Sequence, residues 1–111
     1  NIFMGTCAGL HITGSGSADG SYNIGFGREA LGGLADGGST TGNFNAVMGF
    51  YSGRKISSGS NNVLMGRNTG CSITSGGSNT FLGLGSGKCV STGSKNIAIG
   101  DNSTPPSDTG S

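Results

Sequence analysis

The feature that most constrains this chain is an internal repeat in which an asparagine is followed four residues later by a glycine. The interval between successive asparagines is 22 twice and then 17 three times. Residues 1–111 therefore form a single repeat domain. Positions within a repeat are counted below from its asparagine, so that the glycine stands at +4. The six pairs are Asn1/Gly5, Asn23/Gly27, Asn45/Gly49, Asn62/Gly66, Asn79/Gly83 and Asn96/Gly100.

Composition alone would suggest disorder, because glycine and serine supply 42 of the 111 residues and few side chains remain to offset the entropy of ordering the backbone. The register of the repeat argues for order instead. An aliphatic residue recurs at +11, as Ile12, Leu34, Ile56, Ile73 and Val90. A small residue recurs at +7, as Ala8, Ala30, Ser52, Thr69, Ser86 and Ser103. The five extra residues of each of the first two repeats can all be placed after +11, as expected of loops on one side of a stack.

The repeat length and the apolar segments predict a β structure. Helical repeats run above about 30 residues, and a glycine every few residues disfavours helix. We expect one strand across each Asn-x-x-x-Gly segment, such as 62–66 or 96–100, and a second strand running into +11. The predicted fold is all-β: a β-solenoid (β-roll or β-helix) of about six rungs with 17- and 22-residue coils, whose equivalent strands pair about 4.8 Å apart.

The recurring asparagines and glycines are expected to be architectural. Stacked asparagine side chains can hydrogen-bond from one repeat to the next, which predicts an internal asparagine ladder from Asn1, Asn23, Asn45, Asn62, Asn79 and Asn96. A turn glycine at +4 permits a bend with positive φ or a close approach of two chains. The predicted turn glycines are Gly5, Gly27, Gly49, Gly66, Gly83 and Gly100.

Strand alternation puts +1 and +3 on one face and +2 on the other. We expect +1 and +3 to fill the core with the +11 aliphatics. The +2 row would then lie in water, although it carries no charge and holds four large apolar residues, which favours an interface with other copies around a threefold axis. The alternative is that +2 points into the core and the other row packs less regularly. The predicted interface consists of Phe3, Val47, Leu64, Phe81 and Ala98.

Segments of the chain resemble known fibre repeats. Residues 96–103 (NIAIGDNS) are similar to repeats in the heads of trimeric autotransporter adhesins. Residues 92–100 and 77–83 resemble repeats of phage tail fibres and bacterial surface fibre proteins. The adhesin resemblance implies left-handed β-rolls assembled as trimers with a role in surface attachment, and no catalytic residues. The unequal coils and the cysteines of this chain depart from that pattern.

Groups that could carry chemistry are sparse. His11 is the single histidine and has no cysteine or carboxylate near it in sequence, so we expect no catalytic role for it. Residues 83–88 (GLGSGK) fail as a phosphate loop, because Leu82 and Cys89 stand where a glycine and a Ser or Thr are required. Asp19 and Asp36, one in each long loop, supply too few oxygens for calcium. No catalytic, cofactor or metal site is predicted.

The cysteines show no zinc-binding spacing. The interval from Cys71 to Cys89 is one position longer than the shorter repeat, so the two are expected on neighbouring rungs, where a disulfide is feasible and would suit an oxidising location. Cys7 would then be free or joined to another chain, and the alternative is three small buried residues in a reduced protein. Asn102 begins a glycosylation sequon, although Pro105 follows it closely.

Two functions are compatible with these features. The favoured one is a non-enzymatic structural segment of an extracellular fibre, at a cell surface or on a virion. The alternative is a module that binds a glycan or receptor through its loops or through a hydroxyl column formed by residues 57–58, 74–75 and 91–92. Basic side chains recur at +9 and +10 (Arg54, Lys55, Lys88) and at +5 (Arg28, Arg67); they could meet anionic glycan, but a solvated edge is the favoured role.

The expected partner is the chain itself, as a homo-oligomer with a trimer favoured. Because the sequence opens at the first residue of a coil and closes near the end of one, end-to-end stacking into a filament is a further hypothesis, which Pro105 and Pro106 disfavour. The net charge of +1 predicts no nucleic-acid or membrane partner.

Overall fold

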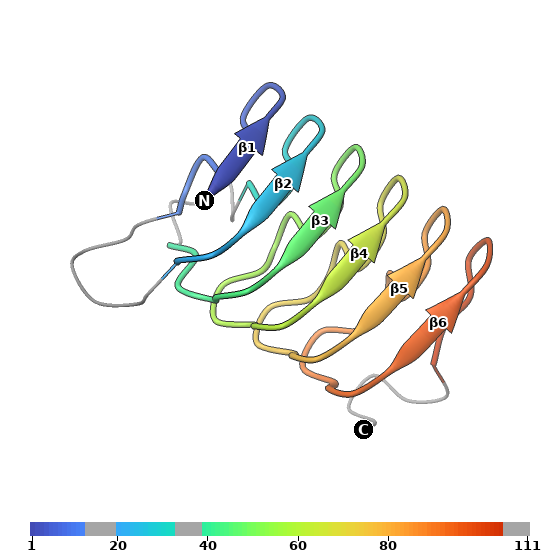
Figure 1. The fold of residues 1–111 in the computed structure, drawn as a ribbon. Coiled ribbons are helices and arrows are strands. Elements are labelled where there is room, and N and C mark those ends of the chain that lie inside the picture. The colour runs from blue at the N-terminus through green and yellow to red at the C-terminus, as the bar shows by residue number, and fades with distance from the viewer. Residues whose placement is uncertain (13–19, 33–38, 106–111) are drawn as a thin grey trace.

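The computed structural model describes residues 1–12, 20–32 and 39–105 and contains one parallel β-sheet. Each strand is three residues long and directly follows the asparagine of its repeat (Figure 1). The strands are β1 (Ile2–Met4), β2 (Ile24–Phe26), β3 (Ala46–Met48), β4 (Val63–Met65), β5 (Thr80–Leu82) and β6 (Ile97–Ile99). The all-β fold class and the first predicted strand of each repeat are therefore confirmed.

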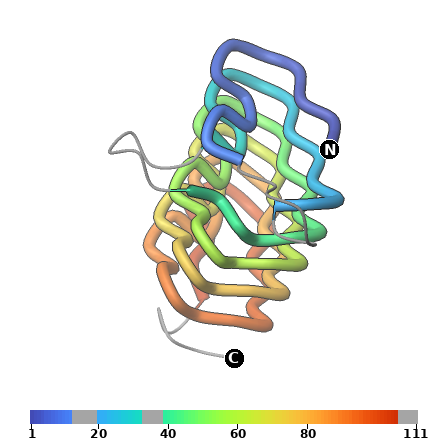
Figure 2. Tube along the Cα trace, turned by 90° about the vertical axis from the view of Figure 1, so that its left-hand side faces the viewer, coloured from blue at the N-terminus to red at the C-terminus, as the bar shows by residue number. Residues whose placement is uncertain are grey.

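The sheet keeps the register of the sequence repeat. Strands pair in sequence order from β1 to β6, and each residue faces the equivalent position of the next repeat, as Leu64 faces Phe81. Between strands the chain turns back, so that successive repeats lie on one another along the long axis of the molecule (Figure 2). Backbone hydrogen bonds also link neighbouring repeats outside the strands, for example from Asn68 N–H to the Phe50 carbonyl and from Gly70 N–H to the Ser86 carbonyl.

The second predicted strand is wrong for the described residues. Around +11 the structure contains bends and one isolated bridge, between Ile12 and Thr40, but no strand. The second strand is missing from the described residues because a turn begins at +8, where Gly53, Gly70 and Gly87 have φ values between 55° and 63°. In this turn the N–H of the +11 residue donates a hydrogen bond to the +8 carbonyl. This turn leaves too few extended residues for a ladder.

The +4 glycines end the strands and begin the turns that follow. Each carbonyl accepts a hydrogen bond from the N–H of the small residue at +7, as Gly66 does from Thr69. Their φ values lie between 120° and 136°, a range that is open essentially only to glycine. The positive φ expected at these positions is therefore present in every repeat, at Gly5, Gly27, Gly49, Gly66, Gly83 and Gly100.

The second property expected of these glycines, a close approach of two chains, holds for five of the six. A Cβ on Gly5, Gly27, Gly49, Gly66 or Gly83 would lie within 2.7 Å of the carbonyl oxygen of the +4 glycine in the next repeat. Any side chain there would push neighbouring repeats apart. Gly100 meets the expectation through its positive φ alone, because an added Cβ would meet no atom closer than Ser103 Cβ at 3.9 Å. Gly100 belongs to the last repeat, and no described repeat is stacked beyond it.

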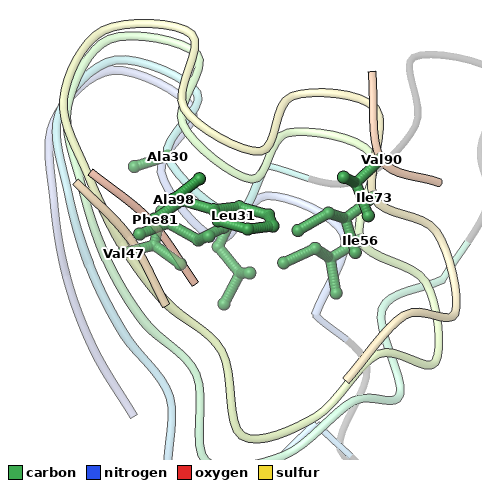
Figure 3. Packing of buried hydrophobic residues seen from close by; sticks show 9 residues of the cluster. Ala30, Leu31, Val47, Ile56, Ile73, Phe81, Val90 and Ala98 are labelled. Carbon is green, nitrogen blue, oxygen red and sulfur yellow. The ribbon is translucent and has the colours of Figure 1, made fainter. Parts of the chain in front are cut away.

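The core lies between the +2 residues of the sheet and the +11 aliphatics. Val47, Phe81 and Ala98 point toward Ile56, Ile73 and Val90 (Figure 3). The prediction that +2 forms an outward interface is therefore wrong: Val47, Leu64 and Phe81 are fully buried, Ala98 is buried, and Phe3 packs against the same cluster. The +2 side chains share a strand face with the asparagine ladder, which points inward. Leu34, the +11 residue of repeat 2, lies outside the described residues.

Repeat 2 fills the same core space from a different position. In repeats 1 and 3 to 5, a large residue at +2 accompanies a glycine at +8, and a Cβ on Gly87 would lie 2.2 Å from the Phe81 ring. In repeat 2, Gly25 stands at +2, and Leu31 stands at +8 and is fully buried. Leu31 has a φ of 52°, a conformation that costs a non-glycine residue about 1–2 kcal/mol. Burial of its side chain offsets that strain.

Exchanging these two residues tests the compensation. Leu31→Gly alone is expected to lower the free energy of unfolding by about 1–3 kcal/mol, because the loss from an unfilled core exceeds the relief of backbone strain. Adding Gly25→Leu, which recreates the pairing of Leu64 with Gly70, should recover part of that loss, because a Cβ at Gly25 would lie 2.9 Å from the Phe3 ring and this ring must shift. Urea denaturation of both single variants and of the double variant measures the loss and the recovery. A double variant whose loss equals the sum of the two single losses would contradict the shared-space interpretation.

Candidate functional site

Asparagine side chains connect the repeats in a buried ladder, as the sequence predicted. The Nδ2 group of Asn62 donates to Asn45 Oδ1 at 3.0 Å and to the Gly76 carbonyl at 3.0 Å. Its Oδ1 accepts from the N–H and the Nδ2 group of Asn79, at 3.0 and 3.1 Å. Equivalent bonds continue along the sheet, and Asn1 Oδ1 accepts from the N–H of Asn23. The amides of Asn23, Asn45, Asn62, Asn79 and Asn96 are buried, so they are not available to a ligand, whereas Asn1 is exposed.

Hydroxyl groups of the predicted Ser/Thr column are partly used in the same way. Ser57 Oγ donates to the Thr74 carbonyl at 3.1 Å, and Thr74 Oγ1 donates to the Ser91 carbonyl at 3.3 Å. The second residue of each pair is exposed, at Ser58, Ser75 and Thr92. Half of the column therefore serves contacts between repeats, which leaves one hydroxyl per repeat facing solvent.

The outward face of the sheet is apolar along its whole length. We call it the outer sheet face, and Thr80 is its only polar member. No side chain on it is charged. Ile97 is 73% exposed and Met65 is 43% exposed. The apolar side chains of the outer sheet face are therefore in contact with water. The outer sheet face consists of Ile2, Met4, Ile24, Phe26, Ala46, Met48, Val63, Met65, Thr80, Leu82, Ile97 and Ile99.

Two aromatic residues extend the exposed apolar surface. Tyr22 and Phe44 stand immediately before the asparagines of repeats 2 and 3, and their rings stack with centroids 5.0 Å apart and planes 3° apart. Their φ values are 59° and 57°, and both side chains are exposed. The repeat explains the stack, because both residues occupy the equivalent position of adjacent repeats, although the stack was not predicted from the sequence.

The basic residues at +9 and +10 meet in a groove that spans repeats 3 to 5. We call it the basic groove; it has a volume of about 260 Å³. Its lining residues are Arg54, Lys55, Asn68, Cys71, Ser72 and Lys88. Arg54 and Lys88 share position +9, with the smaller Cys71 between them in repeat 4. The structure therefore brings together the three cations that the sequence placed at these positions.

Aromatic rings hold the neighbouring arginines. The guanidinium carbon of Arg54 lies 4.9 Å from the Tyr51 ring centroid. Arg28 and Arg67, at +5, each lie 5.7 Å from the centroid of Phe50, which stands at +5 of the repeat between them. The cations were predicted from the repeat, but Phe50 and Tyr51 were not. Phe50 shares the +5 column with Arg28 and Arg67, which was an available signal, whereas Tyr51 at +6 shares no column with Arg54 at +9.

The predicted disulfide is absent, because Cys7, Cys71 and Cys89 are all free. The interval between Cys71 and Cys89 exceeds the repeat by one position, so Cys71 is equivalent to Lys88 and not to Cys89. Its Sγ accordingly lies 3.9 Å from the Lys88 carbonyl oxygen. Cys89 stands one position later in its repeat, at +10, and is exposed.

The remaining residues singled out from the sequence do not form a common site among the described residues. Asn102, of the sequon, is exposed, and its side chain contacts Lys88 Nζ and Asp101 Oδ1 at 3.0 and 2.8 Å. His11 is half-buried. Asp19 and Asp36 lie outside the described residues. In the described part of the chain, no three His, Cys, Asp or Glu side chains gather closely enough to hold a metal ion.

Comparison with known proteins gives no relative from which a function could be taken. A scan against protein-family models and searches of curated proteins and of solved structures found no match. Within residues 1–12, 20–32 and 39–105, no helix has the length and apolar character needed to cross a membrane.

Proposed function

We propose that this chain is a β-solenoid segment of an extracellular fibre, a structural and non-catalytic element that packs against further copies of itself. The outer sheet face carries the proposal, because it is an uncharged and largely apolar surface that includes residues of all six strands. Six strands at about 4.8 Å spacing make this face about 24 Å long. The resemblance of the repeats to fibre proteins supports the location at a cell surface or on a virion.

A second copy of this chain is the occupant that fits the outer sheet face best. The face has no charged group, so it offers nothing to a partner that recognises charge. Its apolar side chains recur once per strand, and a copy lying parallel to it presents side chains at the same spacing. Such a partner can make equivalent contacts at every repeat, whereas a partner without the repeat would match only part of the face.

The hydrogen bonds that polar side chains make between repeats support a structural role. The asparagine amides and the hydroxyls of Ser57 and Thr74 bond between repeats. Among the described residues, no buried side-chain nitrogen or oxygen atom is without a hydrogen-bond partner. The proposal therefore assigns the recurrent polar residues to cohesion along the axis and the outer sheet face to assembly across it.

Charges placed on the outer sheet face test this function. Met48→Lys combined with Met65→Lys should convert the homo-oligomer to monomer, because two ammonium groups per copy would be desolvated in the interface. Sedimentation velocity measures the mass, and far-ultraviolet circular dichroism should be unchanged because both side chains are exposed. A trimer is the expected starting state, and a dimer would support the same contact.

Leu84→Lys is the matched control for that experiment. Leu84 is 49% exposed, as apolar as the two methionines, and lies at +5, outside the outer sheet face. This variant should keep the oligomeric mass of the unmodified chain. Unmodified protein that sediments only as a monomer up to high concentration would overturn the proposed assembly, as would loss of the oligomer in Leu84→Lys but not in the methionine variant.

A further inference from the structure

The basic groove combines cations with small neutral polar groups in a way that the fibre role does not require. It is built from positions +6, +9 and +10, none of which belongs to the outer sheet face. Arg54 and Lys88 stand two repeats apart, which corresponds to about 10 Å along the axis. Cys71 and Ser72 lie between them with shorter side chains, which leaves space between the two cations.

The charge of the groove is not neutralised by carboxylates of the described residues. Among the described residues, only Glu29 and Asp101 have carboxylate side chains, and neither of them lines the groove. Glu29 Oε1 lies 3.7 Å from the Nε of its neighbour Arg28, and Asp101 accepts a hydrogen bond from Asn102. Three cations that share one groove repel one another, and a bound anion would relieve that repulsion.

Part of the groove is held in place before any ligand binds. Arg54 stacks over Tyr51 and is half-buried, and Lys88 Nζ donates to Asn102 Oδ1 at 3.0 Å. Both contacts restrict long side chains that would otherwise lose rotamer freedom on binding. The Asn68 amide and the Ser72 hydroxyl, which also line the groove, can both donate and accept hydrogen bonds.

We propose that the basic groove of Arg54, Lys55 and Lys88 binds the sulfate or carboxylate group of an anionic saccharide. The cations would pair with the anionic group, and Asn68 and Ser72 would bond to the sugar hydroxyls. A volume of about 260 Å³ suits about one sugar unit. Nucleic acid is disfavoured, because its affinity depends on many phosphate contacts along a basic surface and this chain has a net charge of only +1.

Calorimetric titration with four probes tests the ligand class. The probes are a sulfated disaccharide, an unsulfated disaccharide that contains a uronic acid, a neutral disaccharide and inorganic sulfate. We expect one or both anionic disaccharides to bind at least tenfold more tightly than inorganic sulfate, and the neutral one not to bind. The stronger of the two anionic probes identifies the source of the charge. Equal affinity for inorganic sulfate, or binding of none of the four, would overturn the saccharide assignment.

Variants then locate the site. Arg54→Gln combined with Lys88→Gln should weaken binding at least tenfold, while Lys95→Gln, which removes an exposed lysine outside the groove, should leave it unchanged. Circular dichroism and sedimentation of the same samples keep folding and assembly apart from binding, so failure of this site would not count against the fibre role. Equal losses in both variants would point to general charge attraction and contradict the groove as the site.

Discussion

Asn62→Leu is expected to lower the free energy of unfolding by about 2–6 kcal/mol, because it leaves two buried groups unpaired at about 1–3 kcal/mol each. These groups are the N–H of Asn79, which bonds Asn62 Oδ1, and the Gly76 carbonyl, which accepts from Asn62 Nδ2. Leucine matches asparagine closely in size, so lost hydrogen bonds and not a cavity would dominate the effect. Urea denaturation followed by circular dichroism measures it.

The neighbouring asparagine provides the control. Asn61 is exposed and has a φ of 62°, so Asn61→Gly keeps the backbone conformation and removes only a solvated side chain. Its effect should stay within about 0.5 kcal/mol. Equal stability of Asn62→Leu and the unmodified chain would show that the asparagine ladder contributes nothing to cohesion between the repeats.

Phe81→Ala is expected to cost about 3–5 kcal/mol, because it leaves a cavity between the sheet and the +11 aliphatics. Phe81 is 0% exposed and is the largest of the fully buried side chains. Its ring also fills the space beside Gly87, where no side chain is present to take its place. Urea denaturation at a fixed protein concentration is the measurement, since self-association would add stability that depends on concentration.

Leu84→Ala is the control for the core variant. It truncates a half-exposed apolar side chain that lies neither in the core nor on the outer sheet face, so a change below about 1 kcal/mol is expected. A neutral Phe81→Ala together with a costly Met65→Ala would mean that +1 and +3, and not +2, fill the core. The experiment thus tests directly which face of the sheet points inward.

The choice of face is where the sequence-based prediction went wrong, although the sequence held a signal. Residues at 0, +2 and +4 share one side of a strand, so an internal asparagine ladder requires +2 to point inward as well. The apolar character of both rows hid this, because Leu64 and Met65 are equally plausible core residues by composition. Parity with Asn62 would have decided between them.

The sequence by itself determined the register. Five intervals between asparagines were enough to predict that β1 to β6 stack in order and that Asn62 meets Asn79. They also placed glycines such as Gly66 at bends and aligned Arg54 with Lys88. These predictions succeed because stacking places equivalent positions of successive repeats against each other, so a column follows from counting alone.

Only the tertiary structure decided how the columns outside the strands face. Turns with positive φ at +4, +6 and +8 redirect the chain within a few residues, so side-chain direction beyond the strand cannot be obtained by alternation. These turns replace the expected second strand and open the groove between Arg54 and Lys88. The burial of Leu31 opposite Gly25 likewise depends on the space available across the core, which is a property of the packed chain and not of any one segment.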